Sequence, residues 1–240
     1  MAQPVVLFVL ALLAAGVGAW WWWQQEQKRR AAIASFAAAK GWSYSRADPY
    51  GLPARWRSPP FGQGDDREAE NVITGVASGG YPLHAFDYEY TEHRTDSKGH
   101  RHSTTYRFAV LALRLPCGMP GLHVGNENIL TRIGSAVGFS DIEFESEDFN
   151  RAFRVKCDDA KFASDVLHPR AMEMLLQHGR GAEWRFEGAD MLSWRSGRLD
   201  IPDVLQRVDL MCRVLQSIPT FVWKDRGYDP GPQAQSFRGR

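Results

Sequence analysis

A long apolar run near the N-terminus constrains this chain more than any other feature of its sequence. Val5 to Trp23 is mostly apolar and contains no charged side chain. As a helix rising 1.5 Å per residue it would be roughly 28 Å long, which matches the hydrocarbon core of a bilayer. A terminal helix that is apolar on all sides has no polar face to turn toward water. The sequence therefore predicts an N-terminal transmembrane helix within residues 1–25.

The residues that close this run predict an interface and an orientation. Indole rings, which combine an apolar body with one N–H donor, concentrate at the headgroup level of membranes. Basic residues follow, whereas the first four residues carry no charged side chain. By the positive-inside bias, the rest of the chain is expected on the cytoplasmic side of the bacterial inner membrane. The predicted membrane-anchor interface consists of Trp20, Trp21, Trp22, Trp23, Lys28, Arg29 and Arg30.

A cleaved signal peptide is the competing interpretation, because the small residues of Val17-Gly18-Ala19 could suit a signal peptidase. The absence of Lys and Arg before the run and its unusual length favour a retained anchor. Cysteine usage agrees with a cytosolic location. Cys117, Cys157 and Cys212 are odd in number, widely spaced and form no CxxC motif, which is typical of reduced, buried thiols.

Charge and composition exclude several classes of protein. Lys and Arg total 29 against 28 for Asp and Glu, a net charge of +1. Without a basic excess, a dedicated nucleic-acid binder is not expected. The chain is 44% apolar over 240 residues, which excludes a wholly disordered protein and suffices for one domain core of ordinary size.

The remainder divides into three predicted segments. Residues 26–41 favour an alanine-rich juxtamembrane helix that ends at Gly41. Residues 42–224 form the folded domain, and residues 225–240, which lack apolar periodicity, form a disordered tail. A proline- and glycine-rich loop is expected over residues 48–67, with two aromatic residues, Trp56 and Phe61, that could pin it to the core.

Alternating patterns predict an antiparallel hairpin within the domain. In Leu83 to Tyr90 the rings alternate with carboxylates, which indicates a half-buried strand. Thr104 to Leu115 is apolar on both faces, as in a central strand. Between them, Asp96-Ser97-Lys98-Gly99 fits a type I turn followed by a left-handed glycine.

Other strands are expected over 71–76, 141–144, 153–157, 183–187 and 191–195, and helices over 127–137, 159–166, 169–178 and 202–218. The expected fold is α+β: the transmembrane helix, then one soluble domain with a mainly antiparallel sheet and several short helices.

Residues 144–179 resemble the core of an uncharacterised family of bacterial membrane-anchored proteins, a domain of unknown function with the motif E-S-x-x-F-x-x-x-F-x-V. The matching residues are Glu145, Ser146, Phe149, Phe153 and Val155, then Asp159, Ala163, Leu167 and Pro169. More loosely, the resemblance extends over most of the domain. It implies membrane association and a shared fold, and brings no activity and no catalytic residues. From the residues themselves, Ser146 is expected to cap a helix on which Phe149 and Phe153 share a face.

A histidine group in the predicted hairpin is the strongest candidate for chemistry. With a two-residue loop, His93 would lie opposite His102 with His100 nearby, and the three imidazoles could bind a metal ion. With a loop of Ser97 to Gly99, His102 would instead lie opposite Arg94, and His93 would turn to the other face. The neighbouring arginines would repel a cation. The sequence therefore favours a solvated hairpin tip without a metal.

Acidic residues gather in a second group, Asp141, Glu143, Glu145, Glu147 and Asp148. Their alternation with apolar residues indicates a water-facing surface rather than a paired-carboxylate site. No GxSxG, P-loop or HExxH motif occurs. We therefore expect no cofactor, and the sequence identifies no catalytic residue.

These patterns predict a non-enzymatic interaction or assembly module whose partners are the lipid bilayer and a protein of unknown identity. The alternative is a membrane-tethered metal-dependent hydrolase that uses the hairpin histidines.

Overall fold

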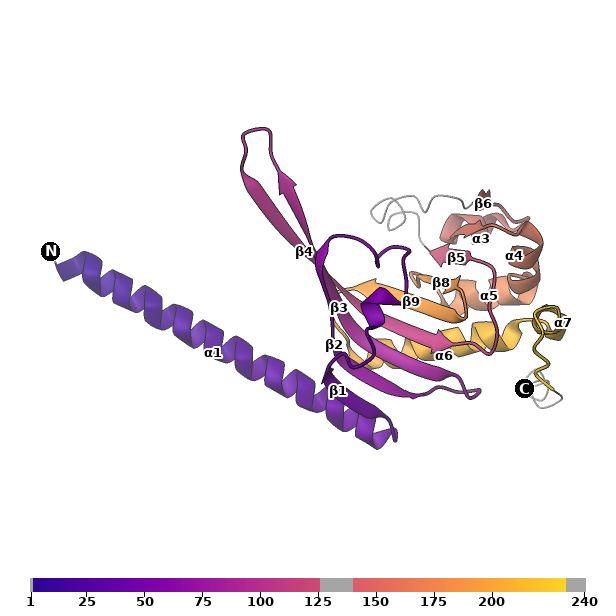
Figure 1. The fold of residues 1–240 in the computed structure, drawn as a ribbon, viewed down its shortest axis with the longest axis horizontal. Coiled ribbons are helices and arrows are strands. Elements are labelled where there is room, and N and C mark those ends of the chain that lie inside the picture. Colours follow the sequence, from indigo (N-terminus) through magenta and orange to yellow (C-terminus); the bar gives the residue numbers. More distant parts are fainter. Residues whose placement is uncertain (1, 126–139, 232–240) are drawn as a thin grey trace.

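The computed structural model describes residues 2–125 and 140–231, with side chains in the first helix from Leu13 onward. Within these residues one nine-stranded antiparallel sheet has the order β1-β2-β3-β4-β9-β8-β5-β7-β6 (Figure 1). Its strands are β1 (Ser43–Ala47), β2 (Asp65–Val76), β3 (Pro82–Thr95), β4 (Arg101–Arg114), β5 (Leu122–Gly125), β6 (Ser140–Ile142), β7 (Arg154–Cys157), β8 (Trp184–Glu187) and β9 (Asp190–Ser196). The helices are α1 (Ala2–Ala39), η1 (Leu52–Ala54), α3 (Glu147–Ala152), α4 (Ala160–Val166), α5 (Pro169–His178), α6 (Ile201–Ser217) and α7 (Thr220–Lys224). The predicted α+β domain with an antiparallel sheet is confirmed.

Strand β4 divides the hydrophobic core in two, as its sequence predicts. Ala109, Leu111 and Leu113 point to the face that the amphipathic helix α6 covers. The alternating residues, including Val110, belong to a second cluster on the opposite face. Because side chains alternate along a strand, the continuous apolar run Phe108 to Leu113 of β4 requires a cover on both faces.

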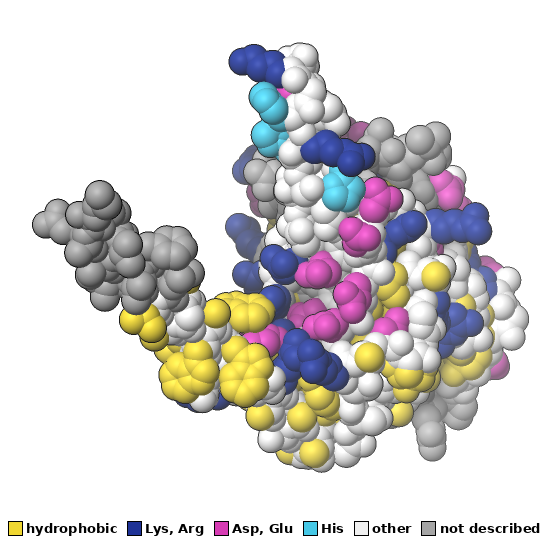
Figure 2. Space-filling model, turned by 60° about the vertical axis from the view of Figure 1, so that its left-hand side comes forward, with side chains coloured by type: hydrophobic (Ala, Val, Ile, Leu, Met, Phe, Trp, Pro, Cys, Tyr) yellow, Lys and Arg dark blue, Asp and Glu magenta, His cyan; other side chains and the backbone are white. Residues whose placement is uncertain are grey.

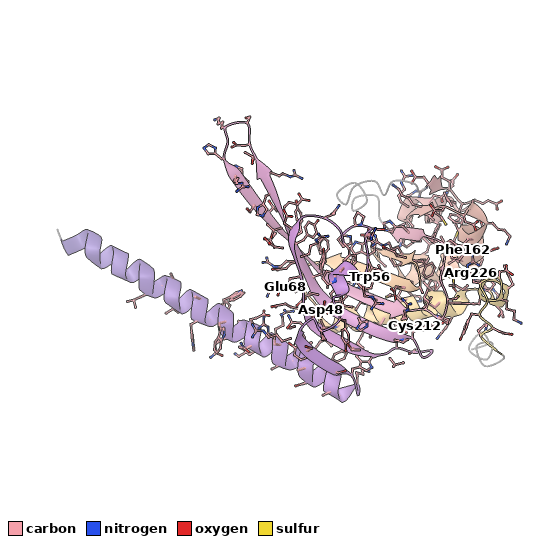
Figure 3. All side chains as sticks on the ribbon, in the orientation of Figure 1. Asp48, Trp56, Glu68, Phe162, Cys212 and Arg226 are labelled. Atoms are coloured by element: carbon pink, nitrogen blue, oxygen red, sulfur yellow. The ribbon has the colours of Figure 1, made fainter. Side chains whose placement is uncertain are left out.

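The cover on the second face is the predicted loop, within which the structure contains only the short helix η1 before β2 begins at Asp65. Trp56 and Phe61 are buried against the sheet, so the loop is pinned as expected. The indole Nε1 of Trp56 donates a hydrogen bond to Asp190 Oδ2 at 3.0 Å, which ties the loop to β9 (Figure 3).

Short helices pack at the far end of the sheet, around β6 and β7 (Figure 1). Ser146 caps α3 by accepting a hydrogen bond from the Phe149 backbone N–H, as the sequence predicts. The guanidinium of Arg226, just after α7, lies 4.5 Å from the ring centre of Phe162 in α4 (Figure 3). The expected helix over 127–137 lies outside the described residues, as does the part of the predicted tail from residue 232 onward.

The predicted transmembrane helix is not supported, and the description of the chain as a single-pass membrane protein is therefore wrong. Among the residues that the structure describes, no helix combines the length and the apolar character needed to cross a bilayer. The same helix continues without a break through charged residues to Ala39.

The C-terminal part of α1 belongs to the folded domain. Ile33 and Ala37 are buried in the main core cluster, and Phe36 meets the ring of Trp42 edge-on at 5.8 Å. Gly41 ends the helix at a φ of 69°, a left-handed conformation that glycine adopts without strain. From this fixed end the helix extends well beyond the sheet (Figure 1).

We predict that Leu111→Ala lowers the free energy of unfolding by about 2–5 kcal/mol, because it leaves a cavity between β4 and α6. The matched control is Leu205→Ala in α6, where the side chain is 39% exposed and the loss should stay below about 1 kcal/mol. Denaturant unfolding of both variants measures the difference. Equal losses would contradict the two-sided core.

Candidate functional site

The tryptophan collar, defined as Trp20 to Trp23, is the most exposed aromatic group that the structure describes. These four rings are between 53% and 61% exposed, and Leu13 and Val17 on the same helix are exposed as well. Successive residues of a helix are turned by about 100°, so four in a row point around its whole circumference. In Figure 2 yellow side chains cover this part of α1, next to a cluster of charged groups on the domain.

The basic residues that follow the collar divide between solvent and the domain. Lys28 is exposed. Arg29 instead turns to the sheet, where its Nη2 lies 2.7 Å from Asp87 Oδ2. Arg30 contacts Glu70 on β2 at 3.2 Å. Two of the three cations expected at the anchor interface therefore hold the helix to the domain.

Glu26 lies at the centre of these contacts and is only 8% exposed. One carboxylate oxygen lies 3.1 Å from Arg29 and 3.0 Å from Arg30. The other lies 2.7 Å from Arg198, in the segment between β9 and α6. A buried carboxylate is tolerated when it is paired and hydrogen-bonded, and three arginines supply that here.

Asp87 is the second anion at the junction between α1 and the sheet, and it is partly buried, with 15% of its side chain exposed. Besides Arg29, it accepts hydrogen bonds from the Leu199 backbone N–H at 2.6 Å and from Asn71 Nδ2 at 2.8 Å. Asn71 Oδ1 in turn accepts a hydrogen bond from Tyr44 OH at 2.8 Å. The alternation of β3 correctly places the carboxylates opposite the buried rings. At Asp87, however, the face of the sheet that carries the carboxylate is covered by α1 and is not open to water.

These residues border a cavity of about 290 Å³ between α1 and the sheet. Trp22 lies at its edge, and the Arg198 guanidinium carbon is 6.0 Å from the centre of that indole ring. Glu68 on β2 and the ion pair of Glu89 with Arg107 also line it. Most of the charged side chains that line the cavity are paired, and these ion pairs position the helix on the sheet.

The structure decides the register of the β3–β4 hairpin. Arg94 lies opposite His102, and His93 lies opposite Ser103, to which it is hydrogen-bonded at 2.8 Å. The pairing of His93 with His102 that a metal site needs does not form. The turn is the one expected, with Gly99 at a φ of 85°.

The tip is organised by Asp96 instead. His100 Nδ1 lies 3.1 Å and His102 Nε2 lies 3.5 Å from Asp96 Oδ2. Hydrogen bonds from backbone N–H groups, that of His100 first, lower the pKa of this carboxyl. Among the described residues no group of His, Cys, Asp or Glu is arranged to hold a metal ion.

The predicted acidic group and the three cysteines are the remaining candidates for chemistry. The predicted acidic group, Asp141 to Asp148, is exposed at each of its five carboxylates, as expected for a solvated face. The three cysteines are free thiols. Burial raises the pKa of the Cys157 thiol and raises that of Cys212 to about 11, so neither is a reactive thiolate at neutral pH.

Comparisons with known proteins point to a fold that is shared with a solved structure. No family model matches the chain, and no curated protein matches its sequence. Among solved structures it is similar to the crystal structure of the mycobacterial trehalose monomycolate transport factor A, TtfA. The TM-score is 0.54 at 14% identity, over 78% of this chain and 94% of that chain. At this identity the likeness shows a shared fold, and the suspected membership of the membrane-anchored family stays a prediction.

We predict that the α1 junction weakens in acid. Burial alone would raise the pKa of Glu26, but hydrogen bonding and charge from Arg29, with the charges of Arg198 and Arg30, lower it below the usual 4.5. Glu26 therefore stabilises the fold above pH 4.5, and this contribution is lost as the pH falls through its lowered pKa.

Denaturant unfolding between pH 7 and pH 3 tests this. Glu26→Gln should cost about 1–3 kcal/mol at pH 7 and flatten the acid dependence. Glu147→Gln, at an exposed carboxyl, should change stability by less than about 0.5 kcal/mol. An unchanged acid dependence in Glu26→Gln would show that this carboxyl does not hold the helix.

Proposed function

We propose that this protein is a non-enzymatic assembly module, serving transport, that attaches to a lipid surface through the tryptophan collar. The observation that carries the proposal is the collar itself: four exposed indoles on a helix whose other end is locked into the domain. The collar can then fix the position of the whole domain relative to a surface.

The distribution of the four indole rings around α1 supports lipid as the binding partner of the tryptophan collar. A helix that lies on a flat protein surface buries one face, whereas the collar points in every direction around α1. Lipid at a bilayer–water interface can surround a helix, and the indole N–H groups find acceptors among the headgroups. The cytoplasmic location stays a prediction.

The assembly role draws support from two sources. The charged groups at the junction of α1 and the sheet are engaged in ion pairs that hold structure. The structural neighbour is described as a transport factor, which fits an accessory role better than an enzymatic one. The hydrolase alternative needs the histidine pairing that β3 and β4 do not form.

We predict that the full-length chain floats with vesicles of phosphatidylethanolamine and phosphatidylglycerol. Replacing Trp20, Trp21, Trp22 and Trp23 together by serine should weaken vesicle binding at least tenfold. The matched control replaces four exposed apolar residues elsewhere, Tyr50, Leu205, Phe221 and Tyr228, by serine, and should bind within about twofold of the native chain.

Equal binding by the two variants would contradict the proposal. Failure of the native chain to bind vesicles, with capture of a protein by the collar instead, would also contradict it.

We further predict weak salt dependence of vesicle binding, because Arg29 and Arg30 are committed to Asp87, Glu26 and Glu70. Raising the salt concentration from about 0.05 to about 0.5 M should weaken binding less than threefold, since exposed charges are screened over these concentrations and apolar contacts are not. A loss of more than about thirtyfold would mean that the arginines leave the junction to contact lipid.

A further inference from the structure

A groove runs between α5 and α6, and we call it the α5–α6 groove. The two helices lie side by side and antiparallel, since His168 at the start of α5 contacts Ser217 at the end of α6. Three hollows of about 640, 200 and 210 Å³ make up the groove, and each shares lining residues with the next. The groove follows the ten residues of α5, roughly 15 Å at 1.5 Å per residue. This length suits a segment of a chain better than a small molecule.

The lining of the α5–α6 groove is cationic. Five arginines border it against three carboxylates, an excess of two positive charges. One of the carboxylates, Glu183, is buried and lies 3.1 Å from His123. Arg170 at one end of the groove is exposed and has no partner in the part of the chain that the structure describes. Arg180 at the other end is exposed as well. The charge of the groove therefore favours an anionic partner.

The other three arginines differ in how firmly they are paired. Arg213, in the middle of the groove, contacts Asp209 one turn away at 2.7 Å, and both side chains are more than half exposed. Exposed pairs of this kind stabilise a helix only slightly, so Arg213 can turn to the carboxylate of a partner. Arg195 and Arg207 both contact Asp203, at 2.9 and 2.7 Å, and are compensated there. The cations available to a partner therefore lie at the start, the middle and the end of the groove.

The walls and the floor of the groove are held in place by the fold. His168 Nδ1 accepts a hydrogen bond from the Ala171 backbone N–H at 3.4 Å, and its Nε2 lies 2.9 Å from the Ser217 carbonyl oxygen. This ring thus joins the start of α5 to the end of α6. Met174 lines the groove between the cations and packs against the main core, which gives the floor an apolar centre. A groove formed before binding lowers the ordering cost of association.

The position of the groove argues against lipid and nucleic acid as its occupant. Figure 1 places α5 at the end of the sheet away from the projecting half of α1, which carries the tryptophan collar. A flat bilayer that surrounds the collar would not enter a hollow between two helices at that distant end. Nucleic acid calls for a larger basic excess than two charges, and the whole chain carries a net charge of +1. An acidic protein segment meets both conditions.

We propose that the α5–α6 groove binds a short acidic segment of a partner protein, with carboxylates at the arginines and an apolar side chain on Met174. A helix of about ten residues or an extended chain of about five would span the groove. The proposal rests on the assembly role proposed above and names the chemistry of the partner. It does not involve the tryptophan collar.

Fluorescence anisotropy tests the proposal with the full-length protein and a labelled peptide of ten residues, two leucines between two runs of four glutamates. Saturable binding is expected. Arg170→Glu combined with Arg213→Glu should weaken it at least about tenfold, because like charges then face the peptide. The matched control, Arg46→Glu with Arg101→Glu, changes the net charge equally at exposed positions outside the groove and should stay within about threefold. Thermal unfolding of both variants verifies that they are folded.

The apolar floor has a test of its own, which leaves the protein unchanged. Replacing the two central leucines of the peptide by serine should weaken binding at least about threefold, since the contact with Met174 loses apolar area. Equal binding of the two peptides would contradict the proposed fit.

Three further results would overturn the proposal: no saturable binding of the leucine peptide, equal losses in the two double variants, or tighter binding of a ten-nucleotide single-stranded DNA than of the peptide. Loss of phosphatidylglycerol vesicle binding in the Arg170 and Arg213 variant would overturn it as well, because the groove would then contact lipid. The chain with all four collar tryptophans replaced should bind the peptide as the native chain does. Failure here and failure of vesicle binding by the collar are therefore separate outcomes.

Discussion

The pairing of two carboxylates between α1 and the sheet, Glu26 buried and Asp87 partly buried, is the interaction on which the rest of this structure depends. Glu26 and Asp87 lose much of their hydration there, and a buried charge is tolerated only with partners at close range. Arg29 bridges the two anions, at 3.1 Å to Glu26 and 2.7 Å to Asp87, and Arg198 closes the network from the segment before α6. Glu26 keeps two arginine partners if one is removed, whereas Arg29 is the cation that contacts both anions, so these contacts together position the helix on the sheet.

This constraint determines what remains for function. Because Arg29 and Arg30 are committed to the domain, the exposed part of α1 presents apolar and aromatic side chains with little charge of its own. If these ion pairs hold the helix in one position, a contact made at the collar sets the place of the whole domain. An assembly module needs this property more than it needs a reactive group.

Local patterns allowed much of the fold to be predicted. Alternation along β3 and β4 gave the central hairpin, the two-sided core and the buried rings, and Gly99 favoured the register that separates His93 from His102. These features depend on neighbours in sequence.

The Arg29–Asp87 pair joins residues 58 positions apart, and the Arg198–Glu26 pair joins residues 172 positions apart. No period or motif marks such pairs, which is why Asp87 was expected to face water and the arginines to face lipid. The predicted transmembrane helix was not supported, since no helix among the described residues is long and apolar enough to cross a membrane.

The distance between α1 and the domain tests the central claim most directly. Spin labels at Leu13→Cys on the helix and Glu147→Cys on α3, with Cys117 replaced by serine, report that distance by double electron–electron resonance. If the buried ion pairs fix the helix, the native background gives one narrow distance distribution and Asp87→Asn broadens it. A broad distribution in the native background, or an equally narrow one in Asp87→Asn, would contradict the account.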